Sequence, residues 1–279
     1  MTSLAETRTA PAAPPRTGPP RLRRLGRPRT FPFARLTGIA VLLGTWSLGS
    51  ALGALDPRKL SAPWTVIATG ADLIGDGTLF ANLVPSLYRV AVGFAAGVLI
   101  GTALAVFAGL TRIGEALVDG PILVKRSVPL LGLAPLMILW LGIGEEFKIV
   151  LIALGVVSYM YMQTHAALIA IDQRHVELAE VLGLSRAAFV RKVVIPGALP
   201  GFFLGLRLSA TIAWLTLVVV ESVNAIDGVG KMIFRAQDYG QSDVILVGLA
   251  VFGIFGFTTD ALLRALERRV LSWRRTLAS

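Results

Sequence analysis

Six long apolar stretches constrain the fold more than any other feature of this sequence. They cover residues 36–54, 88–110, 122–141, 149–170, 201–222 and 244–264. A helix of about 20 apolar residues crosses the hydrocarbon core of a bilayer, where no water is available to satisfy an open backbone. Apolar residues make up 54% of the chain and charged residues only 16%. The predicted fold class is therefore all-α, a polytopic membrane protein with six transmembrane helices.

The distribution of positive charge predicts the orientation of these helices. With both termini in the cytoplasm, 20 of the 27 Lys and Arg residues lie inside and six outside, which leaves Arg207 in the membrane. An excess of Lys and Arg marks cytoplasmic segments, so the sequence predicts an N-in, C-in topology. The third span has Lys125 and Arg126 near its start, and Pro129 and Pro135 are expected to bend it.

The first 35 residues differ in composition from the rest of the chain. They hold eight arginines, one acidic residue and seven of the 15 prolines. A segment of this kind cannot bury enough apolar surface to fold, so we expect a disordered cytoplasmic tail near anionic lipid headgroups. Nucleic-acid binding is not favoured, because neither interleaved aromatic residues nor a nucleic-acid-binding motif accompanies the arginines.

Several kinds of chemistry are not favoured by the residues present. The chain has no cysteine and two histidines, which argues against disulfides, thiol chemistry and most metal sites. In the only Gly-Lys segment, Ala225 stands where a phosphate-binding loop needs its first glycine and Met232 where it needs Ser or Thr. We expect no enzyme activity, no cofactor and no bound metal. An integral membrane enzyme would also need clustered His, Asp and Glu at one membrane face.

The segment 171–200, between the fourth and fifth spans, is longer than a helix–helix connection needs. Gly183 fits the left-handed end of a first short helix, and Ser185 fits the N-cap of a second, which Pro196 should stop. The apolar face of the first helix consists of Leu178, Val181 and Leu182. The residues alone predict a helix–turn–helix elbow at the membrane surface, either an interfacial re-entry or a docking element.

This elbow resembles the cytoplasmic coupling loop of bacterial binding-protein-dependent ABC permeases. The pattern of that loop is E-A-A, three residues, G, nine residues and I-x-L-P. The positions that match it at the family spacing are Glu177, Ala179, Gly183 and Pro196. The positions that depart from it, all by apolar exchanges, are Leu178, Val193 and Ile195.

The resemblance extends over residues 78–275, which are similar to permeases of the aliphatic sulfonate, taurine and nitrate importer group. The stretches that carry it include SLYRVAVGF, VPLLGLAPLMILWLGIG, WLTLVVVE and LERRVLSW. The strongest likeness is to aliphatic sulfonate permeases. It implies a type I importer fold organised as a tail (1–35), a first helix with an extracytoplasmic loop (36–85), a permease core (86–268) containing the elbow, and a basic cytoplasmic tail (269–279).

The family resemblance also implies partners and a location. The complex consists of two permease subunits, here two copies of this chain, with a cytoplasmic ABC ATPase dimer and an extracytoplasmic solute-binding protein. It lies in the bacterial cell (inner) membrane. In the elbow, Glu177 would contact the ATPase, Ala179 would allow close approach, and Gly183 would form the turn. The implied solute is an aliphatic sulfonate, with taurine, nitrate, bicarbonate and a vitamin precursor as alternatives.

Two charged residues in the fifth span are candidates for the translocation path. Arg207 is costly in lipid and fits a structural ion pair, snorkelling or contact with an anionic solute. Glu221 fits a gate, a contact with the binding protein or simple packing. An ion-coupled secondary transporter is the alternative class, but it should show paired acids or inverted halves. Asp260 is the only acid in the middle or inner part of any predicted span, and no inverted repeat is visible.

Overall fold

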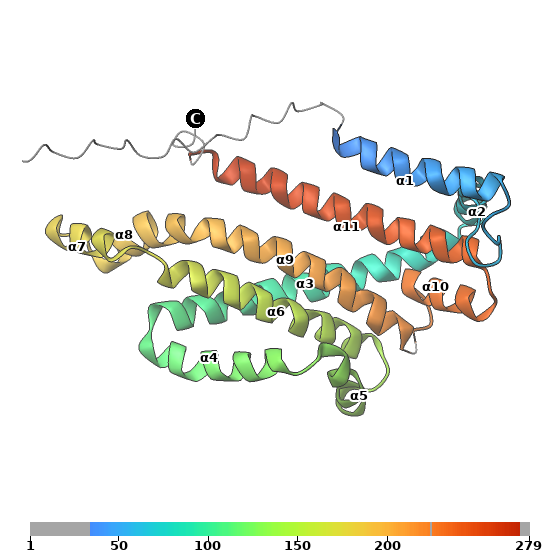
Figure 1. Ribbon diagram of the computed structural model, residues 1–279. Coiled ribbons are helices and arrows are strands. Elements are labelled where there is room, and N and C mark those ends of the chain that lie inside the picture. Colours follow the sequence, from blue (N-terminus) through green and yellow to red (C-terminus); the bar gives the residue numbers. More distant parts are fainter. Residues whose placement is uncertain (1–33, 224, 274–279) are drawn as a thin grey trace, which may run out of the picture. The chain divides into compact units, whose positions relative to one another are not determined.

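The computed structural model describes residues 34–223 and 225–273, which are helical and contain no strand (Figure 1). Except for its last two residues, the predicted N-terminal tail lies outside the described residues, as does 274–279. The helices are α1 (Ala34–Ala51), α2 (Pro63–Gly75), α3 (Thr78–Leu110), α4 (Arg112–Ser127), α5 (Leu130–Leu141), α6 (Glu145–Ile169), α7 (Gln173–Val181), α8 (Arg186–Phe189), a π-helical turn (Val190–Val194), α9 (Ile195–Ser222), α10 (Val229–Asp238) and α11 (Ser242–Val270).

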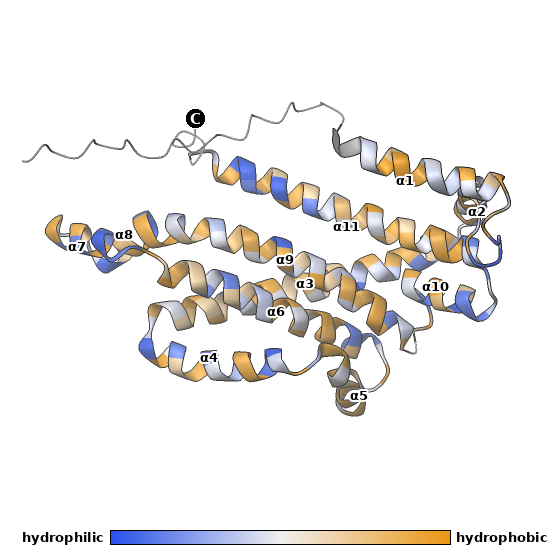
Figure 2. Ribbon diagram, viewed as in Figure 1, coloured by the Kyte–Doolittle hydropathy of each residue, from blue (hydrophilic) through white to orange (hydrophobic). Residues whose placement is uncertain are grey.

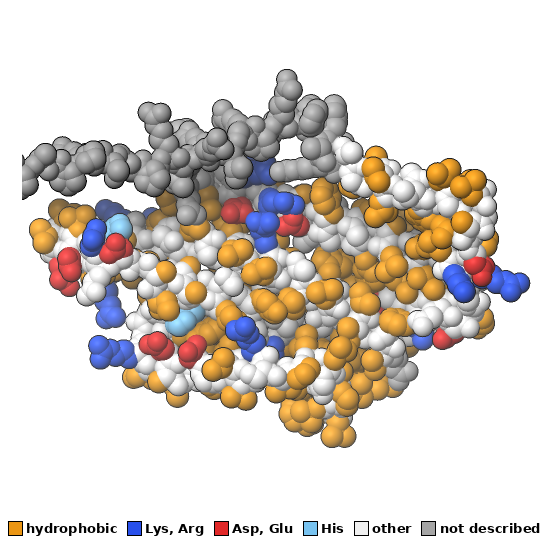
Figure 3. Space-filling model, viewed as in Figure 1, with side chains coloured by type: hydrophobic (Ala, Val, Ile, Leu, Met, Phe, Trp, Pro, Cys, Tyr) orange, Lys and Arg blue, Asp and Glu red, His pale blue; other side chains and the backbone are white. Residues whose placement is uncertain are grey.

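The chain divides into two compact units, one ending at Thr45 and the other beginning at Trp46. Within the second unit, four helical segments are long and apolar enough to cross a membrane: 78–110, 145–169, 186–222 and 242–270. Helices α4 and α5 together make a fifth, bent span. Apolar side chains cover much of the visible face (Figure 3). The all-α polytopic class is confirmed, whereas the count of six spans and the N-in, C-in orientation stay predictions.

Helices α3 and α6 begin earlier in the sequence than the spans predicted for them. Helix α3 begins at Thr78 rather than at residue 88, and α6 begins at Glu145 rather than at residue 149. The predicted boundaries placed Arg89 at the edge of its span and Lys148 outside one. In the structure both cations lie within helices and are buried, because carboxylates pair with them. Glu145 of α6 pairs with Arg89 of α3 and with Lys148 of its own helix.

The predicted bend of the third span is confirmed, and it lies at Pro129. Helix α4 ends at Ser127, and α5 begins at Leu130 at an angle of 103° to it. Proline lacks an N–H and disfavours the helical conformation in the residue before it, and Val128 is extended accordingly. Because α4 already begins at Arg112, the basic pair Lys125–Arg126 lies at the break of this span and not near its start.

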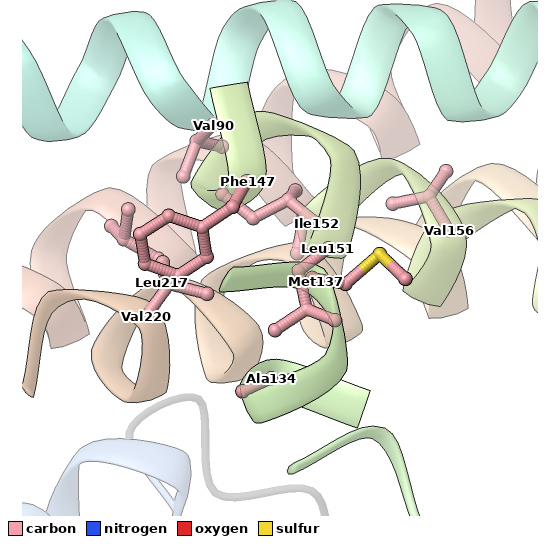
Figure 4. Close-up of a cluster of buried hydrophobic side chains, with 10 residues drawn as sticks. Val90, Ala134, Met137, Phe147, Leu151, Ile152, Val156, Leu217 and Val220 are labelled. Atoms are coloured by element: carbon pink, nitrogen blue, oxygen red, sulfur yellow. The ribbon is translucent and has the colours of Figure 1, made fainter. Parts of the chain in front are cut away.

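Helices α3, α6 and α9 form the centre of the second unit, and Figure 2 shows hydrophobic residues along all three. A Cβ atom on Gly97 would lie 2.5 Å from the Val156 Cβ, and Gly93 and Gly101 meet α6 in the same way. These three glycines, spaced four residues apart on α3, therefore let α3 pack closely against α6. The adjoining core (Figure 4) consists of Val90, Ala134, Met137, Phe147, Leu151, Ile152, Val156, Ala213, Leu217 and Val220.

Candidate functional site: the elbow and a buried charge network

The first helix of the elbow ends in a hydrogen-bonded turn at Gly183. This glycine has a φ of +62°, which confirms the predicted left-handed conformation. The Gly183 N–H donates to the Glu180 carbonyl (3.0 Å), and the Leu184 N–H donates to the Ala179 carbonyl (2.9 Å). These two bonds are those of a Schellman motif, in which glycine avoids the steric cost of positive φ. The turn fixes the direction in which the chain leaves α7.

The second helix of the elbow does not stop at Pro196 as predicted. Ser185 is its N-cap as predicted, since the side chain accepts a bond from the Ala188 N–H (3.3 Å). The helix then passes through the π-helical turn, where the Ile195 N–H donates to the Val190 carbonyl, and continues as α9. A π turn widens the helix, which accommodates the missing N–H and the ring of proline. The elbow is therefore continuous with a membrane span.

The predicted contact residues of the elbow differ in exposure. The apolar face of α7 is open, with Val181 84%, Leu182 64% and Leu178 55% exposed. Glu177 is exposed as well. Ala179 is only 6% exposed, and the close approach to the ATPase expected of it stays a prediction. Of the remaining pattern positions, Ile195 is exposed, and Val193 and Pro196 are partly buried.

A network of buried charges lies at the other end of α6 and α9. Arg89, 1% exposed, donates from Nη1 to Glu221 (2.8 Å), from Nε to Glu145 (2.5 Å) and from Nη2 to Asp227 (2.6 Å). Lys148 donates to the second oxygen of Glu145 (2.7 Å). Two cations thus face three carboxylates, and the network ties α3, α6 and α9 to the segment before α10.

Glu221 is the most enclosed member of this charge network. It is fully buried, and its carboxylate accepts bonds from the Ser86 hydroxyl (2.6 Å) and the Gly230 N–H (2.7 Å). A Cβ atom on Gly228, whose φ is +123°, would lie 2.5 Å from the Glu221 carboxyl carbon. The segment from Ala225 to Met232, which does not match the phosphate-binding loop pattern, therefore encloses the Glu221 carboxylate. Glu221 packs inside the bundle, and its role in the translocation path stays a prediction.

The other four members of this charge network were not predicted from the sequence. Arg89 follows a mainly apolar stretch, residues 79–88, that is typical of a helix. Glu145 and Lys148 are three residues apart, a spacing that places both on one helix face. These features are visible in the sequence. Asp227 precedes α10 in a loop and gives no such signal. Among the described residues, no group of three or more His, Asp and Glu is placed to hold a metal ion.

Arg207 belongs to a second cluster of charges, nearer the elbow. Its Nε lies 3.0 Å from Asp260 Oδ1, and its Nη1 lies 3.8 Å from Glu267. Arg264, one turn along α11, also pairs with Asp260. The ion-pair interpretation of Arg207 is confirmed, and the cluster joins α9 to α11. A role for Arg207 in the translocation path stays a prediction.

Comparison with a solved structure defines the class of fold. The chain matches the structure named "Crystal structure of an amino acid ABC transporter with histidines" with a TM-score of 0.59 and 21% identity. The match covers 71% of this chain and 97% of that one. The chain thus has the fold of an ABC transporter permease of the type I importer class.

Comparison of sequences gives the family. The sequence profile of the binding-protein-dependent transport system inner membrane component matches residues 97–272. The chain is 38% identical over 237 residues to the aliphatic sulfonates transport permease protein SsuC of Bacillus subtilis, covering 85% of this chain and 86% of that protein. It is 36% identical over 240 residues to the taurine transport system permease protein TauC of Escherichia coli, covering 84% and 87%. The chain belongs to this family and is a multi-pass inner-membrane permease of the ABC transporter type.

Proposed function

We propose that this permease imports small organic anions, with aliphatic sulfonates as its substrates. The observation that carries the substrate class is the similarity to permeases named for sulfonates, at 38% identity to the Bacillus subtilis protein and 37% to the Escherichia coli protein. Identity is 36% to the taurine permease, which is named for another sulfonate, and 28% to a nitrate permease of Leptolyngbya laminosa. The lower identity to the nitrate permease supports a sulfonate over nitrate as the substrate.

The energy for import comes from partners in this proposal. A cytoplasmic ATPase dimer hydrolyses ATP, an extracytoplasmic binding protein delivers the solute, and a second copy of this chain completes the path. The apolar face of α7 is open to receive the ATPase, with Val181 84% exposed. The Gly183 turn joins α7 to the second helix of the elbow, and this second helix runs without a break from Arg186 into α9 up to Ser222. Motion of the ATPase would therefore move a membrane span as a rigid lever.

The proposed substrate can be tested with the complete complex. Methane-, ethane- and hexanesulfonate, taurine, nitrate and bicarbonate would each be titrated into the partner binding protein, and the ATPase rate of the reconstituted complex would then be measured with each. We expect tight binding and stimulation by the alkanesulfonates. Stimulation by nitrate or bicarbonate alone, or by none of the alkanesulfonates, would remove the proposed substrate.

Changes in the elbow should uncouple the permease from its ATPase. Glu177→Lys reverses an exposed charge beside the apolar face, and Gly183→Asp puts a side chain at a φ of +62° in the turn. We expect ATPase co-purification and ATP-driven uptake to fall at least fivefold in both variants. Gly240→Asp is the matched control, since Gly240 has a φ of +68° and lies outside the elbow. Normal uptake and co-purification in both elbow variants would refute the docking role.

A further inference from the structure

A cavity of about 330 Å³ lies where the broken span passes α6 and α9. Its lining is largely apolar and includes Leu131 and Leu215, which are both 60% exposed. The lining also includes the basic pair Lys125–Arg126, from the end of α4, and the hydroxyl-bearing residue Ser158. A largely apolar pocket with a few polar groups is typical of sites for small ligands.

The position of Lys125 along the bundle is unusual for a lysine. Its Nζ donates to the Leu154 carbonyl and to the Ser158 hydroxyl (2.8 Å). Ser158 stands near the middle of the 25-residue helix α6, roughly 20 Å from its start at a rise of 1.5 Å per residue. Lys125 therefore lies about halfway across the span. A charge at this depth is costly in lipid, and such residues commonly mark solute or ion paths.

Lys125 also lacks the carboxylate partner that other cations inside the bundle have. An ammonium group carries three N–H donors, and the two bonds of Lys125 to neutral oxygens leave one donor and the whole charge unmatched. Within 34–223 and 225–273, no ion pair includes Lys125 or Arg126. By contrast, carboxylates lie within ion-pair distance of Arg89, Lys148 and Arg207.

We propose that this cavity binds the transported anion within the membrane. The sulfonate group lies beside Lys125, with Arg126 and the Ser158 hydroxyl close by, and the alkyl chain lies against Leu131 and Leu215. The negative charge of the anion thus pairs with Lys125, for which the protein provides no carboxylate. The inference rests on the proposed import of sulfonates and assigns that function its site in the permease.

Gly155 lines the cavity. A Cβ atom at this position would lie 3.1 Å from a methyl group of Ile212 and 3.3 Å from the Thr216 hydroxyl. The glycine therefore lets side chains of α9 pack closely against α6 at the wall of the cavity. A cation whose only task was to join α4 to α6 would need hydrogen bonds but neither the cavity nor its positive charge, and this difference can be tested.

The test separates charge from hydrogen bonding at position 125. Lys125→Gln keeps a donor without the charge, and Lys125→Arg keeps the charge. Each permease would be reconstituted with its ATPase and binding protein in phosphatidylcholine vesicles, whose headgroups carry no net charge. ATP-driven uptake of labelled hexanesulfonate should fall at least tenfold for Lys125→Gln and stay within about threefold of wild type for Lys125→Arg. Arg112→Gln is the control, since it removes an exposed cation from the same helix outside the cavity.

A second measurement uses the purified permease alone. Added hexanesulfonate should raise the unfolding temperature of the wild type and of Lys125→Arg, but not that of Lys125→Gln, because a ligand stabilises the state that binds it. Uptake by Lys125→Gln equal to wild type, or an equal loss in the Gln and Arg variants, would overturn the cavity assignment and leave sulfonate import standing. A wild-type complex that moves no sulfonate would overturn both.

Discussion

Replacing Arg89 by methionine should cost the permease about 3–5 kcal/mol of its free energy of unfolding, the range found when one partner of a buried ion pair is removed. Arg89 is 1% exposed and contacts Glu145, Glu221 and Asp227. Glu145 and Asp227 are about half exposed and can regain water. Glu221 is fully buried and would lose its cation partner without regaining water. Thermal unfolding and denaturant titration of the detergent-purified permease would measure the loss.

Two further variants isolate the cause of this loss. The double variant Arg89→Met with Glu221→Met removes both the cation and the buried carboxylate, so it should recover part of the lost stability, and a double-mutant cycle would measure the coupling. Arg235→Met removes an exposed arginine on α10, and we expect a change within about 0.5 kcal/mol. Equal unfolding temperatures for wild type and Arg89→Met would show that the network does not hold the helices together.

The charge network also shows where sequence analysis of a membrane protein reaches its limit. The apolar stretches identified the class because hydropathy depends on composition alone. The starts of α3 and α6 were misplaced because the predicted spans began next to Arg89 and Lys148, the first charged residues before the apolar runs. Whether a charge can lie inside a helix bundle depends on partners such as Glu221 and Asp227, which lie more than 130 residues from Arg89 in the chain. The sequence alone does not reveal those pairings.

The elbow was predicted better than the charge network because its signals are local. The positive φ of Gly183 and the N-cap of Ser185 are properties of single residues in short segments, and both are confirmed. The effect of Pro196 was predicted wrongly. Proline stops an α-helix only if the preceding turn keeps α-helical geometry, and here that turn is π-helical. The break at Pro129 was predicted from the sequence. The position of Lys125 at that break was not, because the predicted span began at residue 122 whereas α4 begins at Arg112.

Replacing Gly97 by alanine should destabilise the permease by about 1–3 kcal/mol, the usual cost of overpacking a filled interface. The added Cβ would lie 2.5 Å from the Val156 Cβ and 2.8 Å from the Ala153 carbonyl oxygen. Because the second of these is a backbone atom, α3 and α6 must move apart. Close approach of small residues holds helices together in lipid, where no hydrophobic force drives their association. The unfolding temperature and the yield of folded permease would both fall.

Gly253→Ala is the matched control, since no atom lies within 4 Å of a Cβ at this position of α11. Alanine favours the helix by up to about 1 kcal/mol over glycine, so this variant should be neutral or more stable. Trimming the partner in Gly97→Ala with Val156→Ala should not restore stability, because the Val156 Cβ and the Ala153 carbonyl both remain. Full recovery in that double variant would mean that side-chain crowding, and not the distance between the two backbones, sets the packing of α3 on α6.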